Sequence, residues 1–295
     1  MVLALDRGCV PGCAVSIRSL LENADPHVPI RIHVICDGVG DTTRARLARS
    51  SQGAHPDAEM LFHDLDPGPV SGLTQSKLIP RSAYAKLLLD RLIPTSVSRL
   101  IFIDCDLLFE RDAHVLWNTD LGERTVGATR NGGPEETRSH AERLHLPEPQ
   151  YFNSGVLLVD LDRWRDLDVA SRALGAARRF NTRLILHDQD ALNVALACDW
   201  TPIDDLWNAW VILPDLDPEA PTVLHFMGAP KPWDADCDRP FVDRFYGYLD
   251  RTDFAGWRPW NPVGIGALLR RTRRRVPYLP GAVRLVRDRL SPPTP

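Results

Sequence analysis

The sequence lacks the long apolar segments and the closely spaced cysteines that define several classes of protein. No apolar run approaches the roughly 20 residues that a helix needs to cross a membrane. The first residues, MVLALDRG, turn acidic too early for a signal peptide. The six cysteines are scattered without a Cys-x-x-Cys pair, which argues against a zinc module and predicts reduced thiols. Together these absences predict a cytoplasmic protein.

Lysine is also nearly absent. The basic residues are arginines apart from Lys77, Lys86 and Lys231, a bias typical of GC-rich bacterial genomes. Of the 295 residues, 44% are hydrophobic and 25% are charged, as in a globular protein long enough to bury a large core. The formal net charge is −4 at pH 7, and we predict no nucleic-acid partner.

Apolar patterns of strands and helices alternate along the chain. Strand patterns occur at 1–5, 30–36, 58–64, 100–103 and 155–161, and helix patterns occur at 11–23, 82–94, 163–179 and from 187 onward. Because strands connected through helices pair in parallel, this order predicts an α/β fold with a mainly parallel, Rossmann-like sheet flanked by helices.

One apolar strand pattern ends in two carboxylates. In RLIFIDCDLLFE, Asp104 and Asp106 directly follow the apolar run 100–103. An extended chain would put both side chains on one side and Cys105 on the other. Two carboxylates held so close need a proton or a cation between them, and a divalent cation is the usual solution. The carboxyl edge of an α/β sheet is also where ligands bind.

The Asp-x-Asp pattern by itself is not specific, because the chain repeats it elsewhere. The pair at 64 and 66 opens a loop rich in proline and glycine, and the pair at 234 and 236 lies in a polar loop. Unlike those two pairs, the pair at 104 and 106 directly follows a run of large apolar residues, so we predict a metal site there. The alternative is a solvated strand end.

The C-terminal part differs in character from the rest of the chain. Residues 264–290 contain eight arginines and one aspartate, a net charge of +7. Val283, Val286 and Leu290 fall on one face of a possible helix. A basic amphipathic segment predicts a surface helix for anionic lipid, and the alternative is a solvated tail that packs on the core.

Seven segments, in order, resemble bacterial glycosyltransferase family 8, the retaining GT-A enzymes that include the lipopolysaccharide α-galactosyltransferases and, more distantly, glycogenin. The segments are LALD, SAYAKLLL, RLIFIDCDLLF, LWNTDLG, YFNSGVLLVDLDRWR, HDQDALN and LHFMGAPKPW. They cover about residues 1–250. The resemblance implies a GT-A nucleotide-sugar-binding fold, with a catalytic domain over 1–260 and a basic extension over 261–295.

The same resemblance implies a donor site for a UDP-sugar and Mn²⁺, with Mg²⁺ as the other candidate ion. The implied metal ligands are Asp104, Asp106 and His225, and Lys231 is implied to contact the diphosphate. The full set of implied cofactor-binding residues is Ala4, Leu5, Asp6, Lys86, Asp104, Cys105, Asp106, Asn153, Ser154, Asp188, Gln189, His225, Gly228 and Lys231. For Lys86 the alternative is an ordinary exposed helix lysine.

The implied reaction is a retaining transfer of a hexose, with galactose or glucose favoured, to an acceptor hydroxyl. The acceptor would be a saccharide, a lipid-linked glycan or a small-molecule natural product, and the enzyme would be cytoplasmic or peripheral at the inner membrane face. The implied catalytic residues are Gln189, Asp188 and Lys231. Since the amide of Gln189 is a poor nucleophile, we expect attack on the face from which UDP departs.

Two other functions are considered for the chain. A phosphatase of the haloacid dehalogenase type also uses a strand-end Asp-x-Asp, but it needs Thr or Val where Leu108 stands. A catalytically silent sugar-nucleotide-binding protein is disfavoured, because both aspartates, His225 and Lys231 are present.

Overall fold

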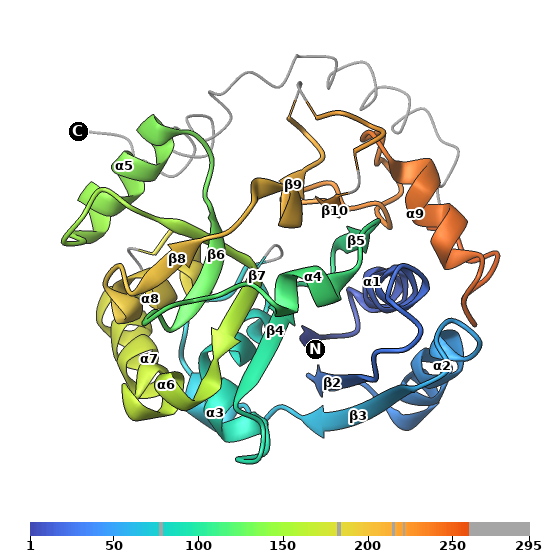
Figure 1. The fold of residues 1–295 in the computed structure, drawn as a ribbon, viewed down its shortest axis with the longest axis horizontal. Coiled ribbons are helices and arrows are strands. Elements are labelled where there is room, and N and C mark those ends of the chain that lie inside the picture. The colour runs from blue at the N-terminus through green and yellow to red at the C-terminus, as the bar shows by residue number, and fades with distance from the viewer. Residues whose placement is uncertain (77–78, 182–183, 214–215, 221, 260–295) are drawn as a thin grey trace, which may run out of the picture.

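The computed structural model describes residues 1–76, 79–181, 184–213, 216–220 and 222–259 (Figure 1). Its main sheet has seven strands in the order β3-β2-β1-β4-β7-β6-β8. Strands β1, β2, β3 and β4 are parallel to one another, whereas β7 is antiparallel to both of its neighbours. The strand bounds are β1 (Val2–Leu5), β2 (Ile30–Cys36), β3 (Ala58–Asp64), β4 (Arg99–Ile103), β6 (Val126–Arg130), β7 (Phe152–Asp160) and β8 (Trp200–Pro202). The predicted α/β fold with a mainly parallel sheet is confirmed.

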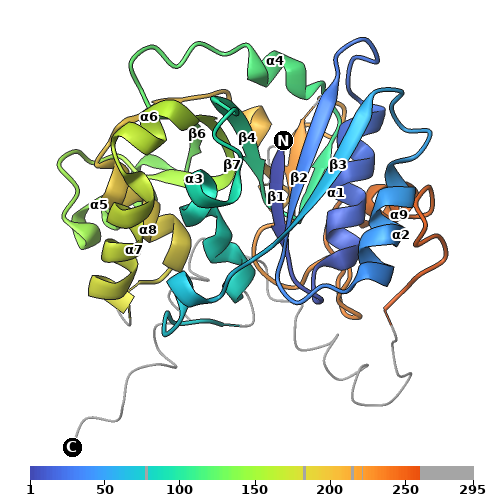
Figure 2. The same cartoon turned by 90° about the horizontal axis from the view of Figure 1, so that it is seen from below.

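Helices cover both faces of this sheet (Figure 2). On one side lie α1 (Val10–Glu22), α2 (Asp41–Ser51) and α9 (Val242–Leu249). On the other side lie α3 (Leu89–Leu92), α6 (Leu161–Asp166), α7 (Val169–Phe180) and α8 (His187–Leu196). Two more helices are α4 (Ala113–Trp117) and α5 (Pro134–Leu144), and 3₁₀ helices span Gly68–Val70 (η1), Arg81–Leu88 (η2) and Asp205–Trp207 (η4).

The core divides into two clusters, one on each face of the sheet. In β1, Val2 and Ala4 belong to one cluster, and Leu3 and Leu5 belong to the other. This division follows from the strand geometry, because successive side chains point to opposite faces. A sheet buried on both faces fits the continuous apolar runs of its parallel strands.

A second, three-stranded sheet places the residues of the candidate site. It consists of β5 (Leu107–Phe109), β10 (Val223–His225) and β9 (Ala209–Trp210), in the order β5-β10-β9. In the antiparallel pairing of β5 with β10, His225 lies opposite Leu107, the residue after Asp106. The N–H of Phe226 donates to the carbonyl of Asp106 at 3.0 Å, which fixes the two segments in register.

Two of the predicted helices differ from the observed ones. The helix predicted over 82–94 starts as the 3₁₀ helix η2 and continues as the short α3. The single helix predicted over 163–179 is wrong, because α6 and α7 are separate helices. Asp168 between them has φ +47°, a left-handed conformation that asparagine and aspartate tolerate better than other non-glycine residues.

Among the described helices, none is both long enough and apolar enough to span a membrane. The basic segment 264–290, for which we predict lipid binding, lies outside the described residues, as does the predicted extension 261–295.

Candidate active site

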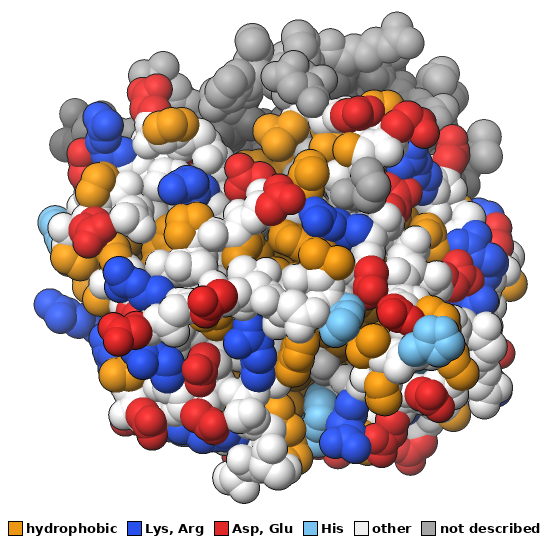
Figure 3. All heavy atoms as spheres, in the orientation of Figure 1, with side chains coloured by type: hydrophobic (Ala, Val, Ile, Leu, Met, Phe, Trp, Pro, Cys, Tyr) orange, Lys and Arg blue, Asp and Glu red, His pale blue; other side chains and the backbone are white. Residues whose placement is uncertain are grey.

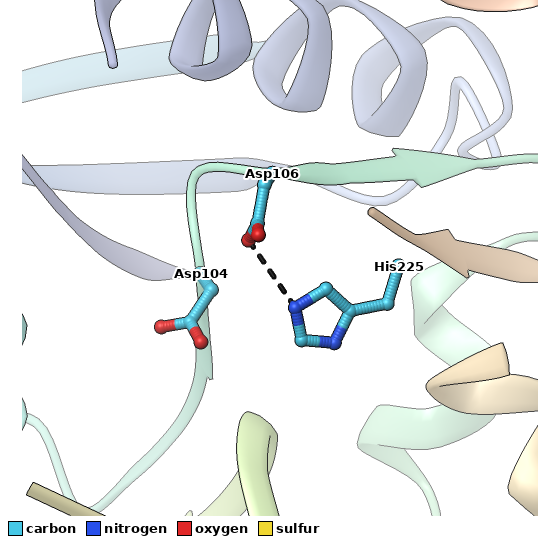
Figure 4. Close-up of side chains that lie close together, drawn as sticks. All are labelled: Asp104, Asp106 and His225. Atoms are coloured by element: carbon cyan, nitrogen blue, oxygen red, sulfur yellow. Dashed lines mark ion pairs between the residues drawn. The ribbon is translucent and has the colours of Figure 1, made fainter. Parts of the chain in front are cut away.

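The two aspartates of the Asp-x-Asp motif lie at the carboxyl end of β4, on the turn that leads to β5. The backbone N–H of Asp104 donates to the carbonyl of Gly155 in β7 at 2.8 Å. The extended conformation predicted for residues 104–106 is wrong, since the chain turns there. Both carboxylates nevertheless lie beside His225, which ends β10 (Figure 4).

Asp104, Asp106 and His225 form a compact group of metal-ligand type. One ligand atom from each lies within 4.8 Å of the others, and His225 Nε2 is 3.3 Å from Asp106 Oδ1. Among the described residues, no other group of this kind is found. Two carboxylates and one imidazole are ligands that suit a divalent transition metal.

The orientation of His225 supports this assignment. Its Nδ1 lies 2.7 Å from Asn208 Oδ1, and the Asn208 amide nitrogen donates to two other side chains. The Asn208 oxygen is therefore the acceptor, so His225 carries a proton on Nδ1. The other ring nitrogen, Nε2, faces the carboxylate of Asp106, an arrangement that needs a proton or a cation between the two atoms. The residues present fit a bound cation.

The pKa shifts of the two aspartates also fit a bound cation. Partial burial raises the pKa of Asp104 above its usual value, Lys86 offsets this only in part, and the charge of Asp106 adds to it. Burial also favours the protonated form of Asp106, but Lys231 and His225 outweigh it and hold the pKa of that carboxyl well below its usual range. Asp106 is therefore firmly ionised. Asp104 is not fully neutralised by Lys86, so further positive charge beside it would stabilise its ionised form.

Lys86 is buried beneath the site rather than exposed on a helix. Its side chain is only 2% exposed, and Nζ lies 2.9 Å from Asp104 Oδ1 and 2.9 Å from Asp188 Oδ2. Burial alone would lower the pKa of Lys86, but the two aspartates outweigh it and raise that pKa above its usual value. Nζ also donates to Ser154 Oγ at 3.1 Å. Lys86 thus joins the Asp-x-Asp turn to β7 and α8.

Lys231 approaches the motif from the loop after β10. Its Nζ contacts the carboxylate of Asp106 and donates to the carbonyl of Phe226 at 3.0 Å. Gly228 lies in the same loop with φ +75°, a conformation that favours glycine.

Both polar atoms of the Gln189 side chain are hydrogen-bonded, to three residues at the end of β6 and in or beside β7. Its Nε2 donates to Asn131 Oδ1 at 3.0 Å and to Tyr151 Oη at 3.1 Å, and its Oε1 accepts from the N–H of Ser154 at 3.0 Å. Asn153 joins the same network, because its Nδ2 donates to Asn131 Oδ1 at 3.1 Å. The neighbouring Asp188 instead pairs with Lys86, so the two adjacent side chains of α8 have different partners.

The fully buried carboxylate of Asp190 is hydrogen-bonded to Tyr151 and so supports the network around Gln189. Asp190 is 0% exposed and accepts hydrogen bonds from Tyr151 Oη and Arg143 Nη2, each at 2.7 Å. The N–H groups of Ile185 and Leu186 also donate to it. Burial would raise the pKa of Asp190, but these donors lower it below the usual value. Tyr151 therefore links an ionised carboxylate to the amide of Gln189.

Removing the Tyr151 hydroxyl should destabilise the fold. In Tyr151→Phe, Asp190 loses one donor and Gln189 loses one acceptor, both in the core. Because hydrogen bonds to charged groups contribute more than neutral ones, we expect the free energy of unfolding to fall by about 1.5–3 kcal/mol, measured by urea denaturation. Tyr246→Phe is the matched control: that hydroxyl donates to the carbonyl of Pro232 near the surface, so the loss should be smaller. Equal losses of unfolding free energy in the two variants would contradict an ionised Asp190 as the acceptor of the Tyr151 hydrogen bond.

Two glycines allow close approaches within the site. A Cβ at Gly155 would lie 2.6 Å from His225 Cε1, and a Cβ at Gly12 would lie 2.4 Å from the carbonyl oxygen of Cys105. Both distances are too short for a real side chain. Strand β7 and helix α1 can therefore pack against the His225 ring and the Asp-x-Asp turn only because they carry no side chain there.

The remaining predicted residues lie at the end of β1. Ala4 and Leu5 are buried in the core, so their contacts to a ligand would have to come from the backbone. Asp6 Oδ1 accepts from the N–H of Gly8 at 2.6 Å, and its Oδ2 accepts from Ser82 Oγ at 3.3 Å. This brings Asp6 to η2, the helix that carries Lys86.

The sequence patterns missed several supporting residues, namely Tyr151, Arg143, Asp190 and Asn208. Asp190 is the last aspartate of HDQD, so its place in the first turn of α8 was a signal. Tyr151 opens the segment YFNSG, whereas Arg143 and Asn208 carry no local motif, and the roles of all three depend on partners far away in the sequence.

Comparisons with known proteins agree with this geometry. The sequence profile of glycosyl transferase family 8 matches residues 1–237. General stress protein A of Bacillus subtilis is 28% identical over 269 residues, 85% of this chain and 90% of that protein. The lipopolysaccharide 1,2-glucosyltransferase of Escherichia coli K12 is 24% identical over 243 residues, 78% of this chain and 71% of that protein. Among solved structures, the galactosyltransferase LgtC in complex with donor and acceptor sugar analogues superposes with a TM-score of 0.75 at 25% identity, covering 85% of this chain and 95% of LgtC.

Proposed function

The chain belongs to glycosyl transferase family 8, and from that premise we propose that it is a metal-dependent, retaining enzyme that moves a hexose from a UDP-sugar to an acceptor hydroxyl. The observation that carries the proposal is the group Asp104, Asp106 and His225, with Lys231 in contact with Asp106. Relatives named for glucose and galactose transfer favour these two hexoses. Family membership removes the phosphatase alternative.

Asp104, Asp106 and His225 would hold the metal, for which Mn²⁺ suits a mixed oxygen and nitrogen ligand set, with Mg²⁺ as the alternative. When bound, the ion would supply positive charge to the diphosphate of the donor.

Lys231 is placed to act on the leaving group. Its Nζ lies at the same carboxylate that we assign to the metal, so a diphosphate bound there lies within reach of this ammonium. Negative charge grows on UDP as the bond to the sugar breaks, and a fixed cation stabilises that charge more than it stabilises the ground state. Gly228 in the same loop leaves room for backbone to approach the phosphates.

Asn153, Asp188 and Gln189 would orient the sugar, because amides and carboxylates bind hydroxyls in fixed directions. Neither of the two candidate nucleophiles is free to attack. Gln189 is an amide with all its polar atoms in hydrogen bonds, and Asp188 is paired with the buried Lys86. This supports attack by the acceptor on the face from which UDP departs, with a UDP phosphate oxygen receiving the proton.

The Gln189→Ala variant should retain measurable transfer activity. If Gln189 only supports the charge that develops on the sugar, its loss should lower kcat by about ten- to a hundredfold, whereas loss of a true nucleophile costs several orders of magnitude. Proton NMR of the fresh product checks the stereochemistry, which should be α from an α-linked donor. A β-linked product would refute retention, and a trapped sugar adduct on Asp188 would refute same-face attack.

The general test is a panel of UDP-sugars with purified protein and Mn²⁺. We expect UDP release from UDP-galactose or UDP-glucose that depends on Mn²⁺ and proceeds slowly without an acceptor. Binding of a UDP-sugar without any release, with or without acceptor, would favour the catalytically silent sugar-nucleotide-binding protein.

A further inference from the structure

A pocket of about 320 Å³ lies on the α5 side of the candidate active site. Its walls include Arg130, Thr137 and Arg138, with Asp205 from the start of η4. Arg130 directly precedes Asn131, whose side chain binds Gln189. The pocket is thus built from segments that also support the site, and in this region basic and acidic side chains are interspersed on the surface (Figure 3).

Among the described residues, the two arginines of the pocket have no partner for their charge. In the part of the chain that the structure describes, neither Arg130 nor Arg138 makes a side-chain hydrogen bond, ion pair or ring contact. Most other described arginines do, for example Arg81 with Asp37 and Arg244 with Glu110. Two unpaired guanidinium groups in one pocket are available for a ligand.

The remaining walls combine the polar side chains of Thr137 and Asp205 with the apolar rings of Pro134 and Pro149. The carboxylate of Asp205 forms no ion pair with either arginine, and Thr137 Oγ1 donates to the carbonyl of Asn131 at 3.1 Å, which ties the pocket to the site. Helix α5 begins at Pro134 beside the pocket without a side-chain cap, so the positive end of its dipole adds to the two charges.

We propose that this pocket binds an acidic residue of the acceptor, through a carboxylate or a phosphate. The inference rests on the proposed function and names the acceptor class for the same site. A guanidinium matches a carboxylate or phosphate with two parallel hydrogen bonds, and Asp205 is placed to accept from a hydroxyl of the same sugar. The volume suits one sugar unit, since small-molecule pockets start at about 300 Å³.

Three monosaccharide probes test the proposal on the full chain in the presence of UDP and Mn²⁺. Methyl β-glucuronide carries a carboxylate, glucose 6-phosphate carries a phosphate, and methyl β-glucoside carries no charge. Dissociation constants come from isothermal titration or ligand-detected NMR. We expect at least one acidic probe to bind about tenfold or more tightly than the neutral glucoside, and the stronger of the two identifies the acidic group.

The double variant Arg130→Gln/Arg138→Gln should lose that preference, with about tenfold weaker binding of the acidic probe and little change for the glucoside. Arg172→Gln is the matched control, because Arg172 is exposed on α7 and its side chain has no partner among the described residues. Equal affinities of wild type for acidic and neutral probes would overturn the proposal without any variant, and so would an unaffected double variant.

Donor cleavage is measured separately on the wild type without acceptor. UDP release with no preference for acidic probes would refute only the acceptor proposal. Selective binding of an acidic probe without UDP release under any condition would refute the proposed function and leave an anion-binding pocket.

Discussion

Asp106→Asn should abolish metal-dependent release of UDP while the protein stays folded. The substitution removes one carboxylate ligand and leaves a side chain of the same size. It should therefore weaken cation binding without changing how the side chain packs. Asp106 is also the aspartate that stays most firmly ionised, because Lys231 and His225 lower its pKa. We expect Mn²⁺-dependent turnover to fall about a hundredfold or more, measured as UDP release against metal concentration.

Direct metal binding separates this effect from a general loss of activity. The Mn²⁺ signal in electron paramagnetic resonance should show weaker binding to Asp106→Asn than to the wild type, while the variant remains folded. Asp162→Asn is the matched control, because Asp162 is the second aspartate of another Asp-x-Asp triplet and is 62% exposed. It should bind Mn²⁺ and turn over like the wild type. Normal Mn²⁺-dependent activity of Asp106→Asn would refute the site.

The sheet was predictable because each of its strands is encoded locally. The runs at 30–36 and 58–64 became β2 and β3 with the predicted bounds, since β-branched and aromatic residues occupy them and turns bound them. The break at Asp168 was not predictable from the pattern. Leu161 and Trp164 before it and Leu174 after it all belong to the same core cluster, so the apolar pattern continues across the break and only the tertiary contacts of α6 and α7 decide that the helix stops.

The site was predictable in its ligands and not in its local geometry. Asp104 and Asp106 follow a strand, as the pattern indicates, but the turn between them depends on the pairing of β5 with β10, a segment more than a hundred residues away in the sequence. The alternating side-chain directions of an extended strand, assumed for residues 104–106, therefore gave the wrong conformation. The resemblance to a family supplied His225 and Lys231, which no local pattern distinguishes from other strand-end or loop residues.

The buried charges beneath the site depend on distant partners. A lysine in a helix pattern is exposed by default, and Lys86 is buried only because Asp104 and Asp188 arrive from two other elements to pair with it. Arg143 and Asp190 form a second such pair between α5 and α8. Neither pair has a sequence spacing that predicts it.

Lys231→Ala should lower kcat by about a hundredfold or more while donor binding changes less. Loss of one charged donor at a leaving group raises the barrier by ~2–4 kcal/mol, because the ammonium interacts most strongly with the charge that appears as UDP departs. Steady-state kinetics of UDP release give kcat and KM separately. Lys231→Arg keeps the positive charge and should recover part of the rate, which a purely structural role of this side chain would not require.

Metal binding should respond to Lys231→Ala in the opposite direction from Asp106→Asn. The ammonium of Lys231 contacts the Asp106 carboxylate directly, so it competes with a metal ion for the same negative charge. Its removal should leave Mn²⁺ binding at least as tight as in the wild type, while turnover falls. Slow turnover with undiminished metal binding therefore assigns Lys231 to the leaving diphosphate. An unchanged kcat would refute that role, and weaker Mn²⁺ binding would instead make Lys231 a residue that orients Asp106.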